Sequence, residues 1–401
     1  MKVDFLVAHP LKHHAFHLAA GCVKSGRSVL LLTPLYRKGL GAFIAMLPGT
    51  LGRRAAGYVH ADIPLGNVWS PLMWQIRRLA SFLGFKFDFN AAFDTFVASL
   101  LLKGKVSPNY VVTLQDYMPR TVLAAKRIGI RVWSDQILNQ SDESMARIER
   151  HNRTISDHDY NSIHDESQNI AIIAASDVVT LPSRFCLHGI ADAVPPAARL
   201  RLVPYGVDDR SFGARKSGDR GGVRIVARAH TVRKGGHLLL RALEMSSERL
   251  LECTNQCGVE ILVLGKFEAQ LRSLMTTLRL PAGISVVDRD VAHSDVPAML
   301  AAADLFVMPS LAESMSLACV EAMQVGLPMV ITKYCGIDAF VSGEMGLEVN
   351  DTVESVAEGL VNVFRDQDKW IIWGANCRAA VARQSWAHYE AQIASISAEV
   401  I

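Results

Sequence analysis

The chain has 401 residues, of which half are hydrophobic and a fifth are charged, so it is too long for one compact core and too apolar for a disordered protein. Its net charge of +3 hides an asymmetry: residues 1–131 hold 17 Lys and Arg against 5 Asp and no Glu, whereas residues 132–401 hold 25 basic and 34 acidic residues. The basic residues of the first part occur as pairs with no nucleic-acid module around them, so we expect no nucleic-acid partner; an anionic membrane surface, an anionic acceptor and ordinary solvated faces all stay open.

Strand-like and helical runs alternate from the start of the chain. A strand is predicted over residues 3–7, a helix over 12–24 and a second strand over 28–32, which is the start of a parallel, doubly wound sheet. Further strands are expected at 110–114, 131–133, 178–180 and 201–203.

A polar, glycine-rich stretch at 208–222 has the composition of a linker. After it the alternation resumes, with strands at 223–227, 260–264, 284–287, 305–308 and 329–332 and helices at 236–245, 268–278, 294–303 and 316–325. The predicted fold class is therefore α/β with two parallel sheets, a first domain at 1–214 and a second at 215–380. A final helix at 381–401 is expected to pack back toward the first domain.

Residues 36–100 are rich in aromatic side chains and poor in acids. Core packing is the default explanation, and an amphipathic surface that meets lipid is the alternative. The first residues, MKVDFLVAH, enter a strand directly and lack the features of a signal peptide, and no apolar run approaches the roughly 18 residues of a membrane span. Scattered cysteines, seven in all, are typical of reduced thiols. We expect a cytoplasmic protein, with a peripheral position on the cytoplasmic face of the membrane as an option.

Two acids stand in the apolar segment LAESMSLACVEAM at 311–323. We place Glu313 in the loop after a strand and Glu321 in the helix that follows, which begins at Ser314 or Ser316, both good N-cap residues. Open α/β sheets bind ligands at the carboxyl ends of their strands, and a helix N-terminus attracts anions. A diphosphate on the amides of Met315–Leu317, flanked by the two acids, would suit this segment; the spacing by itself is equally compatible with one cap-region charge and one solvated charge.

Four segments, taken in order, resemble the family 4 glycosyltransferases, which are retaining enzymes with two facing Rossmann-like domains in the GT-B architecture. They are AASDVVTLPSRF at 174–185, LRLVPYGVDDRSF at 200–212, VARAHTVRKGGHLLLRAL at 226–243 and ADLFVMPSLAESMSLACVEAMQVGLPMVITKYCGIDAF at 303–340. From about residue 174 onward the similarity is nearly continuous. The first half resembles the family only loosely.

The resemblance implies roles for residues of the second domain. Arg228 and Lys234 would hold the donor's diphosphate, Glu313 the donor sugar and Glu321 the ribose hydroxyls. Fixed cations at a leaving phosphate lower the barrier to transfer. The remaining donor-binding residues that it implies are Arg233, Ser314, Met315, Ser316, Leu317, Gly265 and Val291.

This sequence departs from the family pattern at several positions. Ala227 replaces a glycine before the arginine, Arg228 and Lys234 are six apart where five is usual, and Ser316 replaces a glycine. In the first domain the usual glycine pair after the first strand is replaced by His9-Pro10, and Asp135 stands where a histidine is usual. The acceptor-side residues that we expect are His9, His14, Asp116 and Asp135.

No metal site and no cofactor are expected. His13 and His17 are four apart on a predicted helix, but no acidic or cysteine partner completes a site. Asp157-His158-Asp159 and Asp288-Arg289-Asp290 spell a metal-holding triplet without the matching context, and no dinucleotide fingerprint, nucleophile elbow or phosphate loop is present.

The sequence therefore predicts a retaining glycosyltransferase with a nucleotide-sugar donor and a saccharide or lipid-linked acceptor, in cell-envelope polysaccharide assembly. The leaving phosphate is expected to accept the acceptor's proton. Two alternatives stay open: another enzyme of the same architecture, such as a phosphorylase or an epimerase, and a non-catalytic nucleotide-sugar-binding or scaffold protein.

Overall fold

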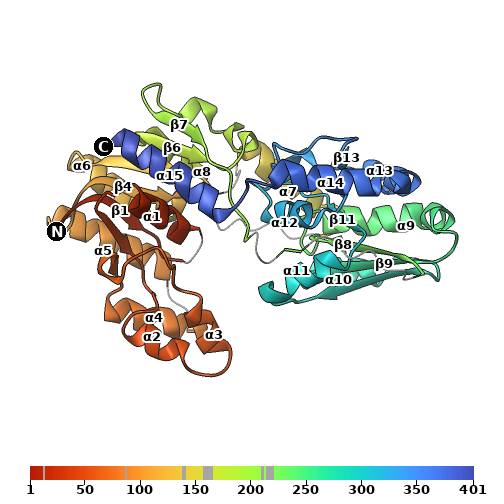
Figure 1. Ribbon diagram of the computed structural model, residues 1–401, viewed down its shortest axis with the longest axis horizontal. Coiled ribbons are helices and arrows are strands. Elements are labelled where there is room, and N and C mark those ends of the chain that lie inside the picture. Colours follow the sequence, from red (N-terminus) through yellow and green to blue (C-terminus); the bar gives the residue numbers. More distant parts are fainter. Residues whose placement is uncertain (12–13, 86–87, 138–140, 157–165, 209–211, 214–220) are drawn as a thin grey trace.

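The structure, a computed structural model, describes residues 1–11, 14–85, 88–137, 141–156, 166–208, 212–213 and 221–401 (Figure 1). Two parallel β-sheets, each covered by helices, lie at opposite ends of an elongated molecule (Figure 1). Parallel sheets with helices on their faces bury almost every strand residue, which agrees with the continuous apolar runs in the sequence. The predicted α/β class with two sheets is confirmed.

The first sheet has seven strands in the order β3-β2-β1-β4-β5-β6-β7. Its register pairs Phe5 of β1 with Val29 of β2 and Tyr110 of β4, so the central strand is buried on both sides. The bounds of its strands are β1 Lys2–Ala8, β2 Val29–Leu32, β3 Val68–Trp69, β4 Ser107–Leu114, β5 Arg131–Asp135, β6 Val178–Leu181 and β7 Arg199–Leu202.

The second sheet has six strands in the order β10-β9-β8-β11-β12-β13. The reversal of strand order between β8 and β11 marks the point where ligands bind in doubly wound sheets. The bounds of its strands are β8 Val223–Ala227, β9 Val259–Leu264, β10 Ile284–Arg289, β11 Leu305–Met308, β12 Met329–Thr332 and β13 Gly346–Val349.

Helices cover both sheets, and three of them, α2, α3 and α4, form a lobe that extends from the first sheet at the bottom of Figure 1. We call this the α2–α4 lobe, residues 40–82. The helices are α1 Ala15–Lys24, α2 Leu40–Ala45, α3 Thr50–Ala56, α4 Leu72–Phe82, α5 Phe89–Leu102, α6 Pro119–Arg127, α7 Asp142–Asn152, α8 Glu166–Ala174, α9 Gly236–Cys253, α10 Ala269–Met275, α11 Val296–Ala301, α12 Leu317–Val325, α13 Val353–Arg365, α14 Trp370–Val381 and α15 Trp386–Val400. Short 3-10 turns lie at η1 Leu65–Asn67, η2 Gln115–Tyr117, η3 Arg184–Leu187, η4 Ala191–Ala193, η5 His293–Asp295, η6 Lys333–Cys335 and η7 Gln367–Lys369.

The chain crosses between the two halves in both directions. After α14 it returns to the first sheet, where α15 packs against α1 and Ile393 lies against Gly21 (Figure 1). In the opposite direction, α7 belongs to the first half of the sequence but buries Ile148 in the hydrophobic core of the second sheet. Each of the two domains therefore includes a helix from the other half of the sequence, and no single boundary in the sequence separates them.

Most predicted strands are confirmed to within one to three residues, and several helices differ in length. The helix expected at 236–245 runs to Cys253, because its apolar face continues against α13. The helix expected at 294–303 is shorter, since a 3-10 turn precedes α11. The strands β3 and β13 were not expected; both are short and lie at sheet edges. Much of the expected linker, the first metal-holding triplet and His13 lie outside the described residues.

Candidate active site

Charged side chains gather at the carboxyl ends of β8 and β11, the two central strands of the second sheet. Arg228 directly follows β8, and the loop after β11 carries Glu313 into the start of α12. The neighbouring strands β8 and β11 are parallel, so these loops meet at one edge of the sheet. The carboxyl edge of the second sheet is therefore the candidate active site.

Glu313 is the centre of an ion cluster. Its side chain is buried, and Oε1 accepts hydrogen bonds from Arg233 at 2.8 Å and from Lys234 Nζ at 2.9 Å. Burial alone would raise the pKa of Glu313, but the charges of Lys234 and Arg233 outweigh it and lower the pKa to about 2. Burial lowers the pKa of Lys234 in turn, against the attraction of Glu313. The carboxylate is held ionised between two cations.

The backbone fixes these two cations. Gly235 adopts the left-handed conformation before α9, with the Pro309 carbonyl where a Cβ would stand. The carbonyl of Arg233 accepts from the Leu311 amide at 2.8 Å, and the Arg233 guanidinium donates to the Ala312 carbonyl at 2.6 Å. The loop after β8 and the loop after β11 are thus tied into one rigid unit.

Arg228 and Glu321 lie at the other side of this edge. Arg228 donates to the Leu264 carbonyl at 3.0 Å, and its buried Nε has no hydrogen-bond partner within the described part of the chain. Glu321 is half-buried in the second turn of α12, and burial raises its pKa to about 7 despite the opposing charge of Arg228. A buried donor without a partner, beside a carboxyl group with a raised pKa, is what a polar ligand would complete.

His230 is a site residue that the sequence analysis missed. It stands between Arg228 and Lys234 in the sequence, and its buried Nδ1 makes no hydrogen bond to any described residue. Burial, together with Arg228 and Lys234, lowers its pKa to about 4, so the ring is neutral. A Cβ on Gly265, whose φ is +111°, would lie 2.6 Å from this ring. The sequence signal that could have identified His230 is its position between Arg228 and Lys234, within residues 226–234.

The start of α12 only partly matches the expectation from sequence. Ser316 is the N-cap, and its hydroxyl accepts from the Cys319 amide at 3.3 Å, as predicted. However, the Ser316 N–H donates to the Cys335 carbonyl at 2.9 Å, and the Ser314 carbonyl accepts from the Ser183 hydroxyl. The Ser316 amide is therefore occupied in this structure, and the expected role of the Met315–Leu317 amides stays a prediction. Leu317 is the first residue of α12, so its N–H has no acceptor within the helix.

Gly265 and Val291, which the resemblance assigns to donor binding, lie where the loops after β9 and β10 meet. Gly265 donates its N–H to the Arg289 carbonyl at 2.7 Å, and Val291 is half-buried two residues further on. In the Asp288-Arg289-Asp290 triplet, Asp288 accepts from the Phe267 amide at 2.9 Å and so shapes this loop.

The acceptor-side residues follow strands of the first sheet. His14 and Asp135 are brought together as a buried pair, with Nε2 2.5 Å from Oδ2, and Thr180 donates to the other carboxylate oxygen. The Tyr205 ring lies tilted at 45° to the His14 ring, with the ring centroids 4.5 Å apart. His9 lies against the Tyr117 ring at 4.8 Å, and Asp116 is in the turn η2. His14 and Thr180 thus each occupy one oxygen of the Asp135 carboxylate.

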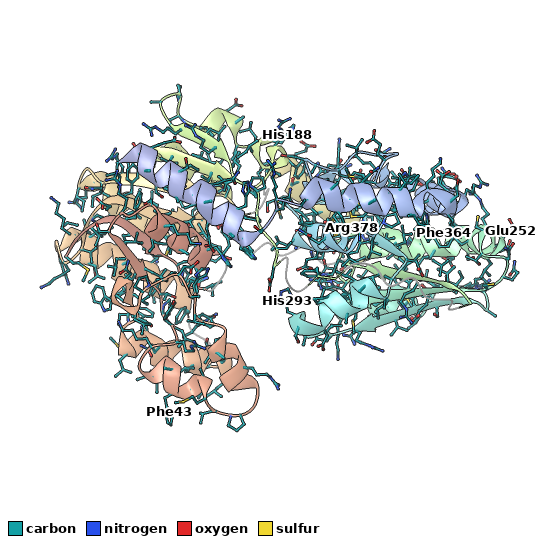
Figure 2. All side chains as sticks on the ribbon, in the orientation of Figure 1. Phe43, His188, Glu252, His293, Phe364 and Arg378 are labelled. Atoms are coloured by element: carbon teal, nitrogen blue, oxygen red, sulfur yellow. The ribbon has the colours of Figure 1, made fainter. Side chains whose placement is uncertain are left out.

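The two carboxyl edges face each other. Arg184, after β6 of the first sheet, donates its N–H to the Asp338 carboxylate at 2.8 Å, and Ser183 contacts the Ser314 carbonyl. From α7, the buried Arg147 donates to the Leu311 carbonyl at 2.9 Å and lies 3.7 Å above the Tyr334 ring. His293, labelled in Figure 2, also lies at the end of the second domain that is turned toward the first.

Comparison with known proteins decides the class of the second domain. Residues 221–366 match the family model described as glycosyl transferases group 1. The second domain is a group 1 glycosyltransferase domain. Arg228, Arg233, Lys234, Glu313 and Glu321 all fall within the matched stretch of this glycosyltransferase domain.

Curated relatives are similar to parts of the chain. A UDP-Gal:alpha-D-GlcNAc-diphosphoundecaprenol alpha-1,3-galactosyltransferase of Escherichia coli is 39% identical over 21% of the chain and 22% of its own length. A GDP-mannose-dependent alpha-(1-6)-phosphatidylinositol monomannoside mannosyltransferase of Mycobacterium tuberculosis (strain ATCC 25618 / H37Rv) is 28% identical over 52% of the chain and 58% of its own length. The matched stretches thus span less than two thirds of these relatives.

Solved structures are similar to the whole chain. Anabaena HepE in complex with UDP and glucose has a TM-score of 0.63 at 15% identity, covering 98% of this chain and 99% of that one. The sucrose-phosphate synthase of Thermosynechococcus elongatus has a TM-score of 0.63 at 14% identity, covering 100% and 99%. The glycosyltransferase domain and its partner domain together have the GT-B fold. Among the described helices, none combines the length and hydropathy of a membrane span.

Proposed function

We propose that this protein is a retaining glycosyltransferase that moves a sugar from a nucleotide-sugar donor to a hydroxyl of a saccharide or lipid-linked acceptor. The observation that carries this proposal is the ion cluster at the carboxyl edge of the second sheet, where Arg233 and Lys234 converge on the buried Glu313. Such a cluster concentrates fixed positive charge beside a carboxylate. A diphosphate that carries a sugar needs both kinds of group.

The cations have the chemical role of stabilising the leaving group. Negative charge grows on the diphosphate as its bond to the sugar breaks, and cations already fixed in a partly dry site stabilise that charge without reorganising. Arg228 and Lys234 are assigned to the diphosphate, and Arg233 shares the charge through its contact with Glu313. No metal ion or other cofactor is needed in this mechanism.

The two acids are assigned to opposite ends of the donor. Glu313, in the loop before α12, accepts hydrogen bonds from the sugar hydroxyls, while Glu321, in the second turn of α12, accepts from the ribose. Carboxylates accept charge-assisted hydrogen bonds from paired hydroxyls. Glu321 is half-buried with a raised pKa, which a ligand's donors would offset.

The acceptor side supports the proposed retention of configuration. Asp135 is already engaged by His14 and Thr180, so it is not placed to take a proton from an acceptor. In our proposal, the departing phosphate oxygen takes the acceptor's proton on the face of the sugar that it leaves. The new bond then forms on that same face.

A lipid-linked acceptor is supported by the α2–α4 lobe and by the names of the relatives. Both relatives described above are named for lipid-linked acceptors. On and next to the lobe, apolar side chains are exposed beside the exposed basic residues Arg37, Lys38, Arg53 and Arg77, and Phe43 lies at its outer end (Figure 2). The exposed apolar residues are Phe43, Met46, Leu47, Leu65, Leu72, Met73, Ile76, Leu83 and Phe85. We assign this surface to an anionic membrane face.

The activity is tested with purified protein and a panel of nucleotide sugars, beginning with UDP-galactose and GDP-mannose. The donor is expected to raise the melting temperature by mass action, and transfer to a membrane extract is expected to follow. Lys234→Ala and Arg228→Ala should each lower kcat by roughly 100- to 1,000-fold. Arg249→Ala, which removes an exposed cation of the same domain, is the matched control.

Donor binding without transfer or donor hydrolysis would contradict the enzymatic proposal and point to a binding protein. The membrane assignment is tested separately by flotation with anionic vesicles at low salt. The double change Phe43→Ser and Met73→Ser should abolish retention, and Ile371→Ser, on an exposed apolar residue of α14, should not. No retention of the parent protein would remove the membrane assignment.

A further inference from the structure

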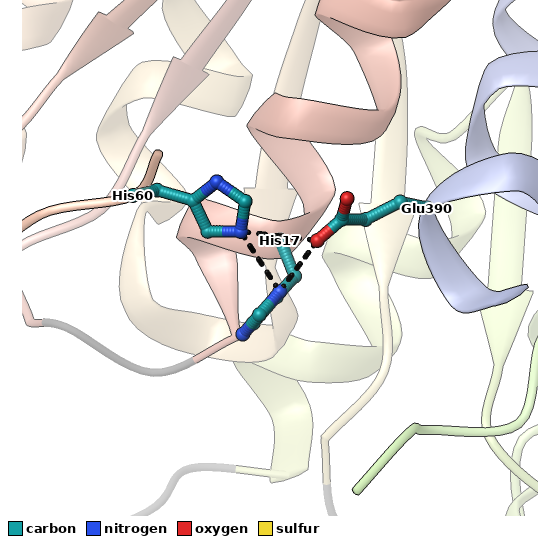
Figure 3. Close-up of side chains that lie close together, drawn as sticks. All are labelled: His17, His60 and Glu390. Carbon is teal, nitrogen blue, oxygen red and sulfur yellow. Dashed lines mark hydrogen bonds and ion pairs between the residues drawn. The ribbon is translucent and has the colours of Figure 1, made fainter. Parts of the chain in front are cut away.

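Three side chains from distant parts of the chain converge on the first domain, away from the donor site (Figure 3). His17 comes from α1, His60 from the loop before β3, and Glu390 from α15. His17 Nδ1 lies 2.7 Å from Glu390 Oε1, His60 Nε2 lies 3.0 Å from the same oxygen, and the two nitrogens are 3.1 Å apart. One potential ligand atom from each residue therefore meets at a single point.

Hydrogen bonds can hold this triangle when no ion is bound. With a proton on each facing nitrogen, both rings donate to Glu390 Oε1. Without these two protons, all three atoms present lone pairs to the same point. A cation at that point would accept the three lone pairs and take the place of the two protons.

The dimensions fit a small divalent ion. With metal–ligand bonds of about 2.0–2.1 Å, tetrahedral ligand atoms lie about 3.3 Å apart. The three distances here are 2.7, 3.0 and 3.1 Å, so the cluster has to open by only a few tenths of an ångström. Two imidazole nitrogens and one carboxylate oxygen form a ligand set that suits Zn²⁺ and its neighbours rather than Mg²⁺ or Ca²⁺.

The charges around the three ligands favour a cation. Lys24 Nζ lies 2.5 Å from the other oxygen of Glu390 and 2.8 Å from Asp62. The two acids and one lysine leave a net negative charge that attracts a cation. Access is open on the His17 side, where the side chain is 26% exposed.

We propose that His17, His60 and Glu390 bind one Zn²⁺-class ion, with water in the open position, and that the ion fastens α15 to the first domain. Binding moves the remaining proton of the His60 ring to Nδ1, which exchanges the 3.2 Å hydrogen bond from the Asp62 amide for a metal–nitrogen bond. The Trp386 ring stacks on His17 at 4.0 Å and holds it in place. The site is structural and does not depend on the proposed transfer reaction.

The test uses the full-length protein after treatment with a chelator. Isothermal titration with Zn²⁺ should give one ion per chain, Zn²⁺ should raise the melting temperature, and Co²⁺ should give the intense visible absorption of a tetrahedral site. His60→Gln and Glu390→Gln should each weaken Zn²⁺ binding on the order of 100-fold or more, since even outer-shell changes at metal sites reach that size. His388→Gln, on an exposed histidine of the same helix, should bind as the parent does.

His60→Gln keeps the contacts of Lys24 with Glu390, so this variant remains informative if Glu390→Gln folds poorly. Circular dichroism of each variant without metal reports directly whether it is folded. Absence of Zn²⁺ binding to the folded parent at micromolar concentration would overturn the proposal. Unchanged binding by folded His60→Gln would overturn it too.

Discussion

Glu313 and Glu321 are eight residues apart, and their pKa values shift in opposite directions. Glu313 is surrounded by Arg233 and Lys234, which lower its pKa to about 2. Glu321 is partly buried and has no cation hydrogen-bonded to it among the described residues, so burial raises its pKa to about 7. The same residue type therefore has two charge states within one site, because the environments differ in what accompanies burial.

Replacing Glu321 with Gln should stabilise the ligand-free protein and weaken donor binding. The folded pKa of Glu321 is raised, so its contribution to stability is fully present below the unfolded value and is lost as pH rises through about 7. Above pH 7 the variant should be more stable than the parent by up to about 3 kcal/mol, and the difference should vanish in acid. Urea denaturation at several pH values measures it, and donor titration should show a lower affinity. A variant that loses stability above pH 7 would contradict the raised pKa.

Replacing Glu313 with Gln should have the opposite effect on stability. The folded pKa of about 2 lies below the unfolded value, so the stabilisation is present above the unfolded pKa and is lost as pH falls toward about 2. Removing one partner of a buried ion cluster costs about 3–5 kcal/mol near neutral pH, and the cost should shrink in acid. The same denaturation series measures it, and a cost that does not change with pH would show that the cations are not what stabilises the carboxylate.

At the scale of elements, helix α7 supports the loop that carries Glu313. It comes from the first half of the sequence, yet its Arg147 donates to the carbonyl of Leu311, two residues before Glu313. Ile148 is buried in the core of the second sheet beside it, and His151 lies 3.2 Å from Asp351. These contacts from α7 hold the loop more rigidly than the contacts within the loop alone would.

Arg147→Ala should loosen this loop. The change leaves the Leu311 carbonyl without its donor and removes the packing over Tyr334, so we expect a loss of about 1–3 kcal/mol in the free energy of unfolding. Donor affinity should fall as well, because the Leu311 carbonyl lies only two residues before Glu313. Arg150→Ala, an exposed residue of the same helix, is the control and should change stability by less than about 0.5 kcal/mol. Equal effects of the two changes would contradict the bracing role of α7.

At the scale of the whole molecule, the last helix completes the first domain. Helix α15 follows α14 of the second domain but packs on α1, and both termini lie at the same end of the molecule (Figure 1). A Cβ on Gly21 would lie 2.6 Å from the Cβ of Ile393, so the two helices approach closely there. The first domain therefore cannot finish folding before the end of the chain is available.

Ile393→Ala should destabilise the first domain although the residue lies beyond the second in sequence. Ile393 is fully buried, and deleting its side chain in a close-packed core costs about 2–5 kcal/mol. In calorimetry, the transition of the first domain should shift down while the transition that a bound donor stabilises stays in place. Ser395→Ala, on an exposed position of α15, is the control. A shift confined to the donor-stabilised transition would contradict this assignment of α15.

The sequence alone determined the alternation of strands and helices and the position in it of the residues that we propose for the donor site. Apolar runs such as residues 305–308 are continuous because parallel strands are buried on both faces, so their pattern is readable locally. The cap at Ser316 and the loop position of Glu313 follow from the same short-range rules. Short edge strands such as β13 bury little and leave a weak local pattern, which is why they were missed.

Only the tertiary structure decided which distant groups meet. Glu390 reaches His17 across 373 positions, and Arg147 reaches Leu311 across 164, so no spacing rule within one element could pair them. The occupied amide of Ser316 likewise depends on Cys335, which arrives from the next strand and turn. Local sequence sets conformation over a few residues through backbone sterics and hydrogen bonds, whereas contacts between charges far apart in the chain exist only once packing has brought their elements together.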